Sequence, residues 1–416
     1  MLFILSACVV SGYLLIVCSY ALPLQWPETL RNETTAILYQ EGLYPADKVS
    51  GRHIDNWADS YSLLIASYEG EEGPFEKAAN AYYYRSTYNP YDWLSGRTGP
   101  EQPVEKASYS RYWHGTVPLL RLLMCRMNFA EIRRLNTVCL AALLLTVFIV
   151  LQLRIPESVI PFLLTIFLLA PTAIGSCLEY SGVHYIMLLM TILIAIDWKP
   201  INAGTNVKYL FFASGILTAY IDFLSAPTIS LSIPLIFLCL RRKKEKGLVS
   251  LAAFCVLYWV VGYVGMWGGK WLIAALSQGD SFVKELLYSI RQRSSASDLD
   301  GLAITRVHAL STNVKQLFSD WYINMLIILY TLLTAIRSMV RYRQITRLDI
   351  RNAGILSIPL LISVGWYLVF ANHSIVHFWL HTYRTAAPAL FGILCAIDLG
   401  NIQRGLNPNL QRNEML

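Results

Sequence analysis

The chain has 416 residues, of which 55% are hydrophobic and only 15% charged, and its mean hydropathy is +0.44. A soluble globular protein carries about 25% charged residues and does not repeat apolar runs of roughly 20 residues, the length that crosses a bilayer. The composition therefore excludes a soluble protein and indicates a multi-pass membrane protein. The net charge of +7 comes from short basic clusters between apolar runs, which membrane topology explains better than nucleic-acid binding does.

Ten apolar runs are candidates for membrane spans, so the expected fold is an all-α polytopic membrane protein with about ten transmembrane helices. The first run has no basic residues before it and is long for a signal peptide, so we interpret it as an uncleaved helix. The expected spans are residues 2–22, 135–153, 157–173, 182–198, 208–224, 227–240, 248–268, 321–339, 353–370 and 384–400.

The distribution of Lys and Arg predicts that both ends of the chain are cytoplasmic, because basic residues concentrate in cytoplasmic loops. The cluster at 241–246 and the arginines at 337–351 then lie inside. The expected divisions are residues 1–22 (helix 1), 23–133 (extracytoplasmic loop with interfacial helices), 134–271 (helices 2–7), 272–320 (second extracytoplasmic loop), 321–400 (helices 8–10) and 401–416 (cytoplasmic tail).

The first large loop contains two aspartates, Asp55 and Asp59, in a stretch with the apolar spacing of a short amphipathic helix. Residues four apart share a helix face, so the two carboxylates form a candidate pair for general-base catalysis near the membrane. The alternative is structural, with Asp55 capping the helix and Asp59 facing solvent.

The same loop ends in a cluster of aromatic and basic residues that includes Arg111 and His114. Aromatic side chains here either stack on sugar rings or anchor the loop at the headgroup level. Residues 116–130 are too charged to span easily, which predicts an interfacial helix whose Arg121 faces anionic headgroups.

Near the C-terminus, residues 372–384 place His373, His377 and His381 four apart, so that in a helix the three rings line one face. Such a row binds a divalent metal, binds phosphate or sugar hydroxyls, or forms an interfacial belt. No HExxH motif accompanies the histidines, so we expect no metal as a resident cofactor and keep a divalent metal as the alternative.

Arg384 opens the last expected span beside Tyr383, and a cation next to hydrocarbon requires a partner. A phosphate group suits the guanidinium fork. Asp222, near the outer end of an earlier span, is an alternative partner that would form a structural ion pair. Glu179 lies on the same expected face and is permitted to join the site.

This layout resembles the GT-C superfamily of polytopic glycosyltransferases, and it also looks like uncharacterised bacterial membrane proteins of similar layout. The resemblance covers most of the chain and rests on short motifs: Asp55-Asn56-Trp57-Ala58-Asp59-Ser60, Ser110-Arg111-Tyr112-Trp113-His114-Gly115, and Asn372-His373-Ser374 with His377 and Thr382-Tyr383-Arg384. It implies an enzyme in the bacterial cytoplasmic membrane. That enzyme would transfer a sugar from a polyprenyl-(di)phosphate donor to a glycan or lipid acceptor of the cell envelope on the outer face.

The resemblance implies Asp55 as the catalytic base and Arg384 as the phosphate ligand, with further contacts from His373, His377 or Arg121. Three other classes remain as alternatives: a polysaccharide polymerase or ligase, a lipid-linked glycan transporter (flippase), and a scaffold protein that docks through the acidic loop. A transporter would carry charges deep in its helices, whereas here polar residues gather toward one face.

Overall fold

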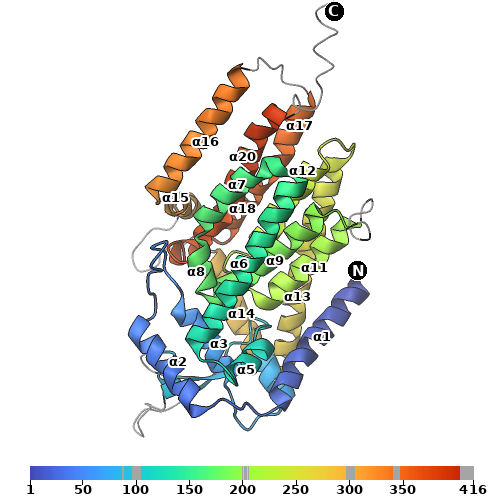
Figure 1. The fold of residues 1–416 in the computed structure, drawn as a ribbon. Helices are drawn as coiled ribbons and strands as arrows, with labels where there is room; N and C mark the ends of the chain where they lie inside the picture. The colour runs from blue at the N-terminus through green and yellow to red at the C-terminus, as the bar shows by residue number, and fades with distance from the viewer. Residues whose placement is uncertain are drawn as a thin grey trace, which may run out of the picture.

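The computed structural model describes residues 1–86, 89–95, 105–198, 200, 204, 206–296, 305–340 and 347–402. The described residues form an elongated, almost entirely helical molecule. Figure 1 shows the elements between α1 and α6 gathered at one end, and the far ends of α16, α17 and α20 at the other. The expected cytoplasmic tail lies, from residue 403 onward, outside the described residues.

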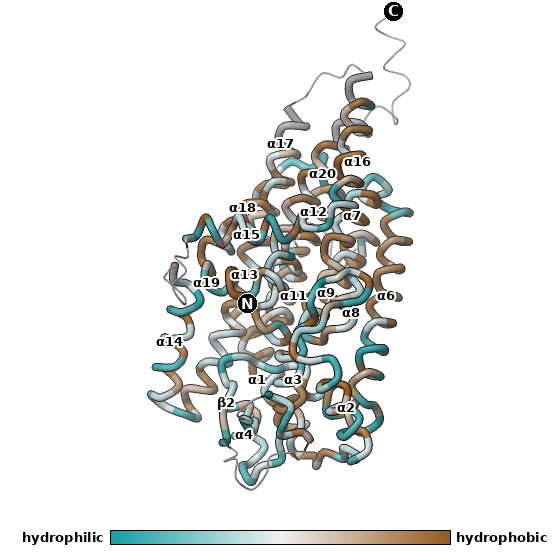
Figure 2. The backbone as a smooth tube through the Cα atoms, turned by 90° about the vertical axis from the view of Figure 1, so that its left-hand side faces the viewer, coloured by the Kyte–Doolittle hydropathy of each residue, from teal (hydrophilic) through white to brown (hydrophobic). Residues whose placement is uncertain are grey.

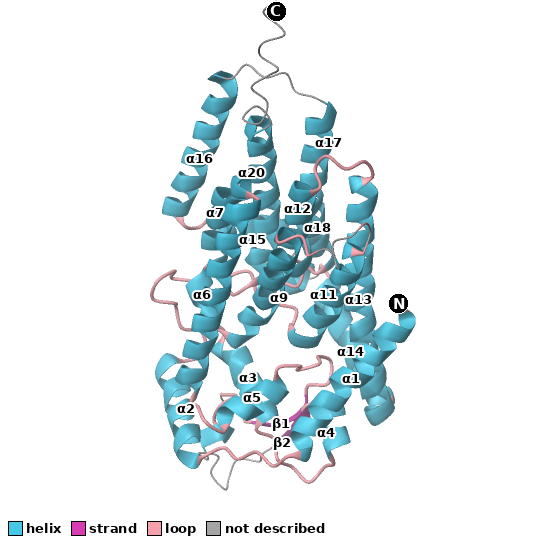
Figure 3. Ribbon diagram, turned by 45° about the vertical axis from the view of Figure 1, so that its right-hand side comes forward, coloured by secondary structure: helices cyan, strands magenta, loops and turns pink. Residues whose placement is uncertain are grey.

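The N-terminal region is a small layer of short elements that follows the first long helix. These elements are α1 (Leu2–Ala21), α2 (Glu28–Glu41), α3 (Asn56–Ala66), α4 (Pro74–Asn80), β1 (Tyr82–Arg85), the 3-10 helix η1 (Trp93–Ser95), β2 (Glu105–Ser108) and α5 (Val117–Met124). The two strands pair antiparallel, and Figure 3 shows them beside α4. The sequence pattern predicted short helices in this region but not the sheet.

The helical bundle begins with α6 and accounts for most of the remaining chain. Its first half contains α6 (Phe129–Arg154), η2 (Pro156–Ser158), α7 (Val159–Leu169), α8 (Pro171–Gly175), α9 (Leu178–Ala195), α11 (Val207–Ile221), α12 (Ile229–Arg241) and α13 (Leu248–Gln278). Its second half contains α14 (Asp280–Ser294), α15 (Arg306–Leu317), α16 (Trp321–Val340), α17 (Arg347–Leu356), α18 (Ile358–Val369), α19 (Ala371–Val376), η3 (Thr382–Ala386) and α20 (Ala387–Ile402).

The prediction of an all-helical membrane-type fold is confirmed, but the number of spans shown is smaller than ten. Within the described part of the chain, five helices are long and apolar enough to cross a membrane, or six if the pair 306–317 and 321–337, bent by 87°, is one span. Four further apolar helices have only 10–17 residues: Pro156–Leu169, Val207–Ile221, Ile229–Arg241 and Thr382–Ile397. In Figure 2 the bundle helices are mainly brown, whereas teal segments gather around α2, α4 and α14.

Helices α11 and α13 pack closely because each presents a glycine to the backbone of the other. A Cβ atom on Gly215 would lie 2.2 Å from the Trp259 carbonyl oxygen, and one on Gly262 would lie 2.3 Å from the Phe212 carbonyl oxygen. Small residues of this kind let helix backbones approach in membrane proteins, where packing replaces the hydrophobic effect between helices.

Arg121 fastens the N-terminal region to the first helix rather than facing headgroups. Its guanidinium donates to the carbonyl oxygens of Ser19 (3.0 Å), Leu22 (2.7 Å) and Ala66 (2.7 Å), and it pairs with Glu69 (2.8 Å). Because these bonds engage the whole fork and the side chain is 5% exposed, Arg121 is a structural clamp. The interfacial role predicted for Arg121 is therefore corrected.

We predict that Gly115→Ala lowers the free energy of unfolding by about 1–3 kcal/mol through overpacking. A Cβ atom there would lie 2.3 Å from the Tyr220 ring and 2.5 Å from the Tyr220 carbonyl oxygen, which also accepts the Gly115 N–H. The thermal midpoint of the purified protein in detergent measures the loss. Gly268→Ala is the control because no atom lies within 4 Å of its Cβ position, and equal midpoints for the two variants would contradict the prediction.

Candidate functional site

Asp55 sits at the start of α3, where its side chain caps the helix. Oδ1 accepts the Ala58 N–H at 2.9 Å, and the residue is only 3% exposed. Burial raises the pKa of this carboxyl to about 7, with a smaller upward contribution from the Asp59 charge, against the lowering effect of the Ala58 N–H. The capping interpretation is thus correct, and it coexists with a pKa near neutrality, which suits a general base.

Asp59 lies one turn further along α3, and it caps a second helix in the bundle. Its oxygens accept the N–H groups of Leu178 and Glu179, each at 3.0 Å, at the start of α9. Burial raises the pKa of Asp59, while the charge of Arg133 lowers it. Since both oxygens are occupied by backbone donors, Asp59 is suited to positioning rather than to proton transfer.

Glu179 is brought beside Asp55 by that cap. It is 7% exposed, and its Oε2 has no hydrogen-bond partner among the described residues. The pKa of Tyr44 is raised to about 12, first by burial and then by the charges of Asp55 and Glu179. Both acids therefore lie near the Tyr44 phenol. The structure therefore groups Asp55, Asp59 and Glu179, three carboxylates from two chain segments.

Arg384 lies in η3 and is 1% exposed. Its Nε donates to the Leu169 carbonyl oxygen and its Nη1 to that of Leu380, both at 2.9 Å. Nη2 is buried without a partner among the described residues. The guanidinium stacks 4.4 Å from the centre of the Tyr180 ring and 4.9 Å from that of Tyr383.

Tyr180 connects this arginine to the carboxylate group. Its hydroxyl donates to the His53 carbonyl oxygen at 3.4 Å, two residues before Asp55. Asp55 and Arg384 thus lie on two sides of one tyrosine. Arg384 does not line any of the cavities described below, and its 1% exposure leaves little surface for a phosphate to contact.

Tyr383 and Asp222 also have structural surroundings. The Tyr383 ring is buried and has the guanidinium of Arg52 4.8 Å from its centre. Asp222 accepts the N–H groups of Leu224 (2.9 Å) and Ser225 (3.2 Å) and so shapes the turn after α11. It forms no ion pair with Arg384 among the described residues, which corrects the expectation of such a pair.

The three histidines come together although they do not share one helix. α19 ends at Val376, yet ring centres lie 4.8 Å apart for His373 and His377 and 5.0 Å apart for His377 and His381. His373 donates to the Leu224 carbonyl oxygen (2.9 Å) and His381 to that of Ser225 (2.8 Å). Among the described residues, no group of three His, Cys, Asp or Glu side chains is arranged to hold a metal ion.

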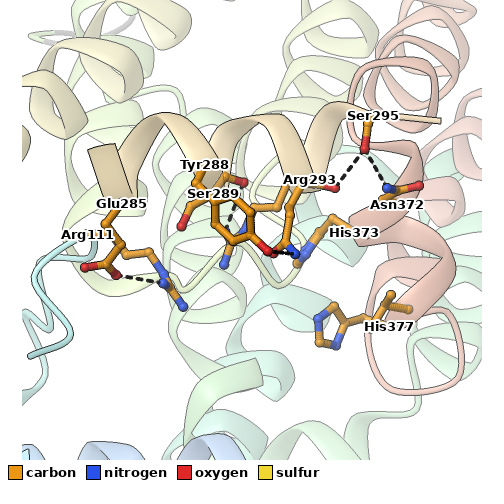
Figure 4. A pocket seen from close by; sticks show the side chains of 11 residues that line it. Arg111, Glu285, Tyr288, Ser289, Arg293, Ser295, Asn372, His373 and His377 are labelled. Carbon is orange, nitrogen blue, oxygen red and sulfur yellow. Dashed lines mark hydrogen bonds and ion pairs between the residues drawn. The ribbon is translucent and has the colours of Figure 1, made fainter. Parts of the chain in front are cut away.

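His373 and His377 open on one side into a cavity of about 460 Å³ beneath α14 (Figure 4). Arg111 and Arg293 line the same cavity, so it is strongly basic. The full lining is Arg111, Glu285, Tyr288, Ser289, Gln292, Arg293, Ser295, Asn372, His373, Val376 and His377. We call this space the cationic cavity.

Several polar atoms around the cationic cavity lack partners among the described residues: Nε of Arg111, Nδ1 of His377 and Oδ1 of Asn372. Arg111 forms an ion pair with the half-exposed Glu285 at 3.4 Å, and Arg293 donates to the Tyr112 hydroxyl at 3.3 Å. Burial, followed by the charge of Arg293, lowers the pKa of His377 to about 4, so its ring is neutral at pH 7. The cavity therefore offers an anion two cations and one neutral ring donor, His377.

An apolar pocket of about 180 Å³ adjoins the cationic cavity and shares Arg111, Ser289 and Arg293 with it. Its other walls are almost wholly hydrophobic: Tyr112, Leu224, Tyr263, Val264, Trp267, Trp271, Leu286, Ile290 and Phe370. The two arginines thus stand where a charged group and a hydrocarbon chain of one ligand would meet.

His114 is the remaining predicted site residue, and it faces inward. It is 2% exposed, donates from Nε2 to the Tyr109 carbonyl oxygen at 2.9 Å, and burial lowers its pKa to about 3. Its ring lies 4.9 Å from Phe223. The sequence reasoning missed Arg293, because one arginine in an amphipathic helix carries no local signal; only the fold places it opposite His373.

Comparison of the chain with family models, with curated proteins and with solved structures finds no match.

The raised pKa of Asp55 predicts a pH-dependent stability difference. The folded protein holds this proton up to pH about 7, whereas the unfolded chain releases it near 3.8, so stability falls as pH rises through that interval. Asp55→Asn keeps the cap and removes the titration, so its thermal midpoint relative to wild type should be higher at pH 8 than at pH 5. The exposed Glu28→Gln is the control, and a midpoint of Asp55→Asn relative to wild type that is equal or lower at pH 8 than at pH 5 would refute the assignment.

Proposed function

We propose that this protein is a membrane glycosyltransferase that uses a polyprenyl-(di)phosphate sugar donor, with Asp55 as the general base. The observation that carries the proposal is the cationic cavity continued by an apolar pocket across Arg111 and Arg293. A phosphate attached to a long hydrocarbon chain matches that combination. We further propose ten spans with both termini cytoplasmic, the four short apolar helices completing the count, and the site on the extracytoplasmic face of a bacterial cytoplasmic membrane.

In this proposal Arg111 and Arg293 bind the phosphate through their guanidinium forks, which suit phosphate oxygens better than an ammonium does. Glu285 gives up its contact with Arg111 when the anion enters, at small cost because the pair is partly exposed. His377 remains neutral and donates its ring N–H to the phosphate, whereas the single N–H of neutral His373 is already given to the Leu224 carbonyl oxygen. The first part of the lipid chain lies against Trp267 in the apolar pocket.

In the proposed reaction, the acceptor hydroxyl transfers its proton to the Asp55 carboxylate. The acceptor oxygen forms a bond to the anomeric carbon while the bond from that carbon to the lipid phosphate oxygen breaks, and the phosphate leaves with the electron pair. The two arginines stabilise the charge that grows on the leaving group. Asp59 positions α9, and Arg384 supports the wall through Tyr180, so both act through other residues.

A flippase for the same lipid is the second candidate, because the cationic cavity and apolar pocket would serve it equally well. The two functions differ at Asp55. A transporter requires no base there, whereas transfer to a hydroxyl acceptor does.

We predict that Arg293→Gln weakens the binding of undecaprenyl phosphate at least tenfold, because a charged hydrogen bond worth about 1.5–3 kcal/mol is lost. Quenching of tryptophan fluorescence in nanodiscs measures the affinity, since Trp267 and Trp271 line the apolar pocket. Arg291→Gln is the matched control, being exposed on the same helix and outside the cavity. Equal affinities for the two variants would remove the cavity from the donor site.

We predict that Asp55→Asn lowers turnover at least 100-fold and leaves the affinity for undecaprenyl phosphate unchanged, because only proton transfer is affected. The measurement is the release of undecaprenyl phosphate from undecaprenyl-phosphate hexose donors by the purified protein with membrane lipids as acceptor. Full turnover in the variant would sink the enzyme proposal. Unchanged lipid translocation by the variant, with no release by wild type, would favour the flippase.

A further inference from the structure

A second cavity, of about 430 Å³, lies between α5, α6 and α9, and we call it the α6 groove. Its walls are mostly apolar and include Leu119, Leu123, Leu135 and Tyr185. Leu119 is 58% exposed and Leu135 38%, so the rim is open on the outside of the bundle. α6 is among the helices suited to cross a membrane, and only 17% of its apolar window is buried. The groove therefore faces the hydrocarbon of the bilayer.

Glu179 is the only charged residue among the described residues that line the α6 groove. It is more than nine-tenths buried, and its Oε2 has no partner among the described residues. Burial, followed by the charges of Asp55 and Asp59, raises the pKa of Glu179 well above its ordinary value and so favours its neutral carboxyl form. A buried carboxyl oxygen without a hydrogen-bond partner still costs free energy. A ligand in the groove that donates a hydrogen bond would remove that cost.

The charges around the groove select against an anion. No Lys or Arg lines it, while Asp55 and Asp59 lie close to Glu179. A phosphate would meet a carboxylate and apolar walls, the reverse of the cationic cavity. A hydroxyl fits both features, because it is neutral and can hydrogen-bond to a buried carboxyl group.

The turn that Asp222 shapes separates the groove from the donor side. Phe223 lines the α6 groove, and the next residue, Leu224, lines the apolar pocket. Two lipids in these spaces would approach the Asp55 region from opposite sides of one turn.

We propose that the α6 groove binds the acceptor, and that the acceptor is a neutral lipid whose hydroxyl donates to Glu179 while its chain lies along α6. The role of this lipid as acceptor rests on the proposed function, which the inference extends by naming the chemical class of the acceptor. In the reaction the hydroxyl would turn its single proton from Glu179 to the Asp55 carboxylate, which takes it as the new bond to the sugar forms.

The test is photolabelling of the full-length protein in nanodiscs with a diazirine-bearing hexadecanol, and with the corresponding alkyl phosphate and alkylammonium. The alcohol should label α5, α6 and α9, and excess hexadecanol should abolish that labelling. Cys139→Trp should reduce labelling at least tenfold by filling the groove, whereas Val138→Trp should not. Cys139 lines the groove, while Val138 is 60% exposed and lies outside it.

Glu179→Leu should reduce labelling by the alcohol at least tenfold, with its thermal midpoint measured beside it. Absent alcohol labelling, or labelling by the phosphate or ammonium at equal or greater yield, would overturn the proposal. Photolabelling does not require turnover, so binding in the α6 groove and the glycosyltransferase activity are tested independently. Suppose the alcohol does not label the groove in wild type, while Cys139→Trp still releases undecaprenyl phosphate with a soluble acceptor. That pair of results would contradict the acceptor proposal and leave the glycosyltransferase proposal standing.

Discussion

The cap that Asp59 places on α9 is the interaction on which the arrangement of the candidate site depends. One carboxylate from the N-terminal region accepts two backbone N–H groups at the start of a bundle helix. Those donors have no partner within their own helix, and the positive end of the helix dipole favours a carboxylate there. The bond fixes α3 against α9 and thereby sets Asp55 beside Glu179. Without it, the two acids would belong to independent segments.

The distribution of charge then gives the molecule two unlike cavities. The cationic cavity collects Arg111 and Arg293 with neutral histidines, whereas the α6 groove ends in a single carboxylate. Each is continuous with apolar walls, so each suits an amphipathic ligand, but ligands of opposite character. A protein that only transported a single lipid would need one such environment. Two unlike environments fit the proposed reaction between two lipids better than the transport of one.

The sequence predicted the helical class and the pairing of Asp55 with Asp59, because apolar length and i, i+4 spacing are local properties. The sequence could not show that Asp55 and Asp59 have different roles, because the backbone N–H that Asp59 accepts lies 119 residues away in the chain. Arg384 was the more obvious phosphate ligand by position, yet its donors bind carbonyl oxygens of α7 and residue 380. Arg293 acquires its place only through tertiary contacts. The spacing of the histidines did bring their rings together, but across the end of α19 rather than on one helix face: His373 and His377 are tilted against each other, and His377 and His381 are stacked.

The turn after α11 constrains any mechanism at this site. Leu224 has a positive φ of 73°, unusual for a residue with a side chain, and Asp222 holds that conformation by accepting the N–H groups that follow. The strained backbone directs two carbonyl oxygens at His373 and His381, which fixes the His373 ring at the wall of the cationic cavity and the His381 ring beside it. The same turn keeps Phe223 and Leu224 on the two sides of the site. A reacting sugar would therefore have to pass this turn, and its rigidity would determine how closely donor and acceptor approach Asp55.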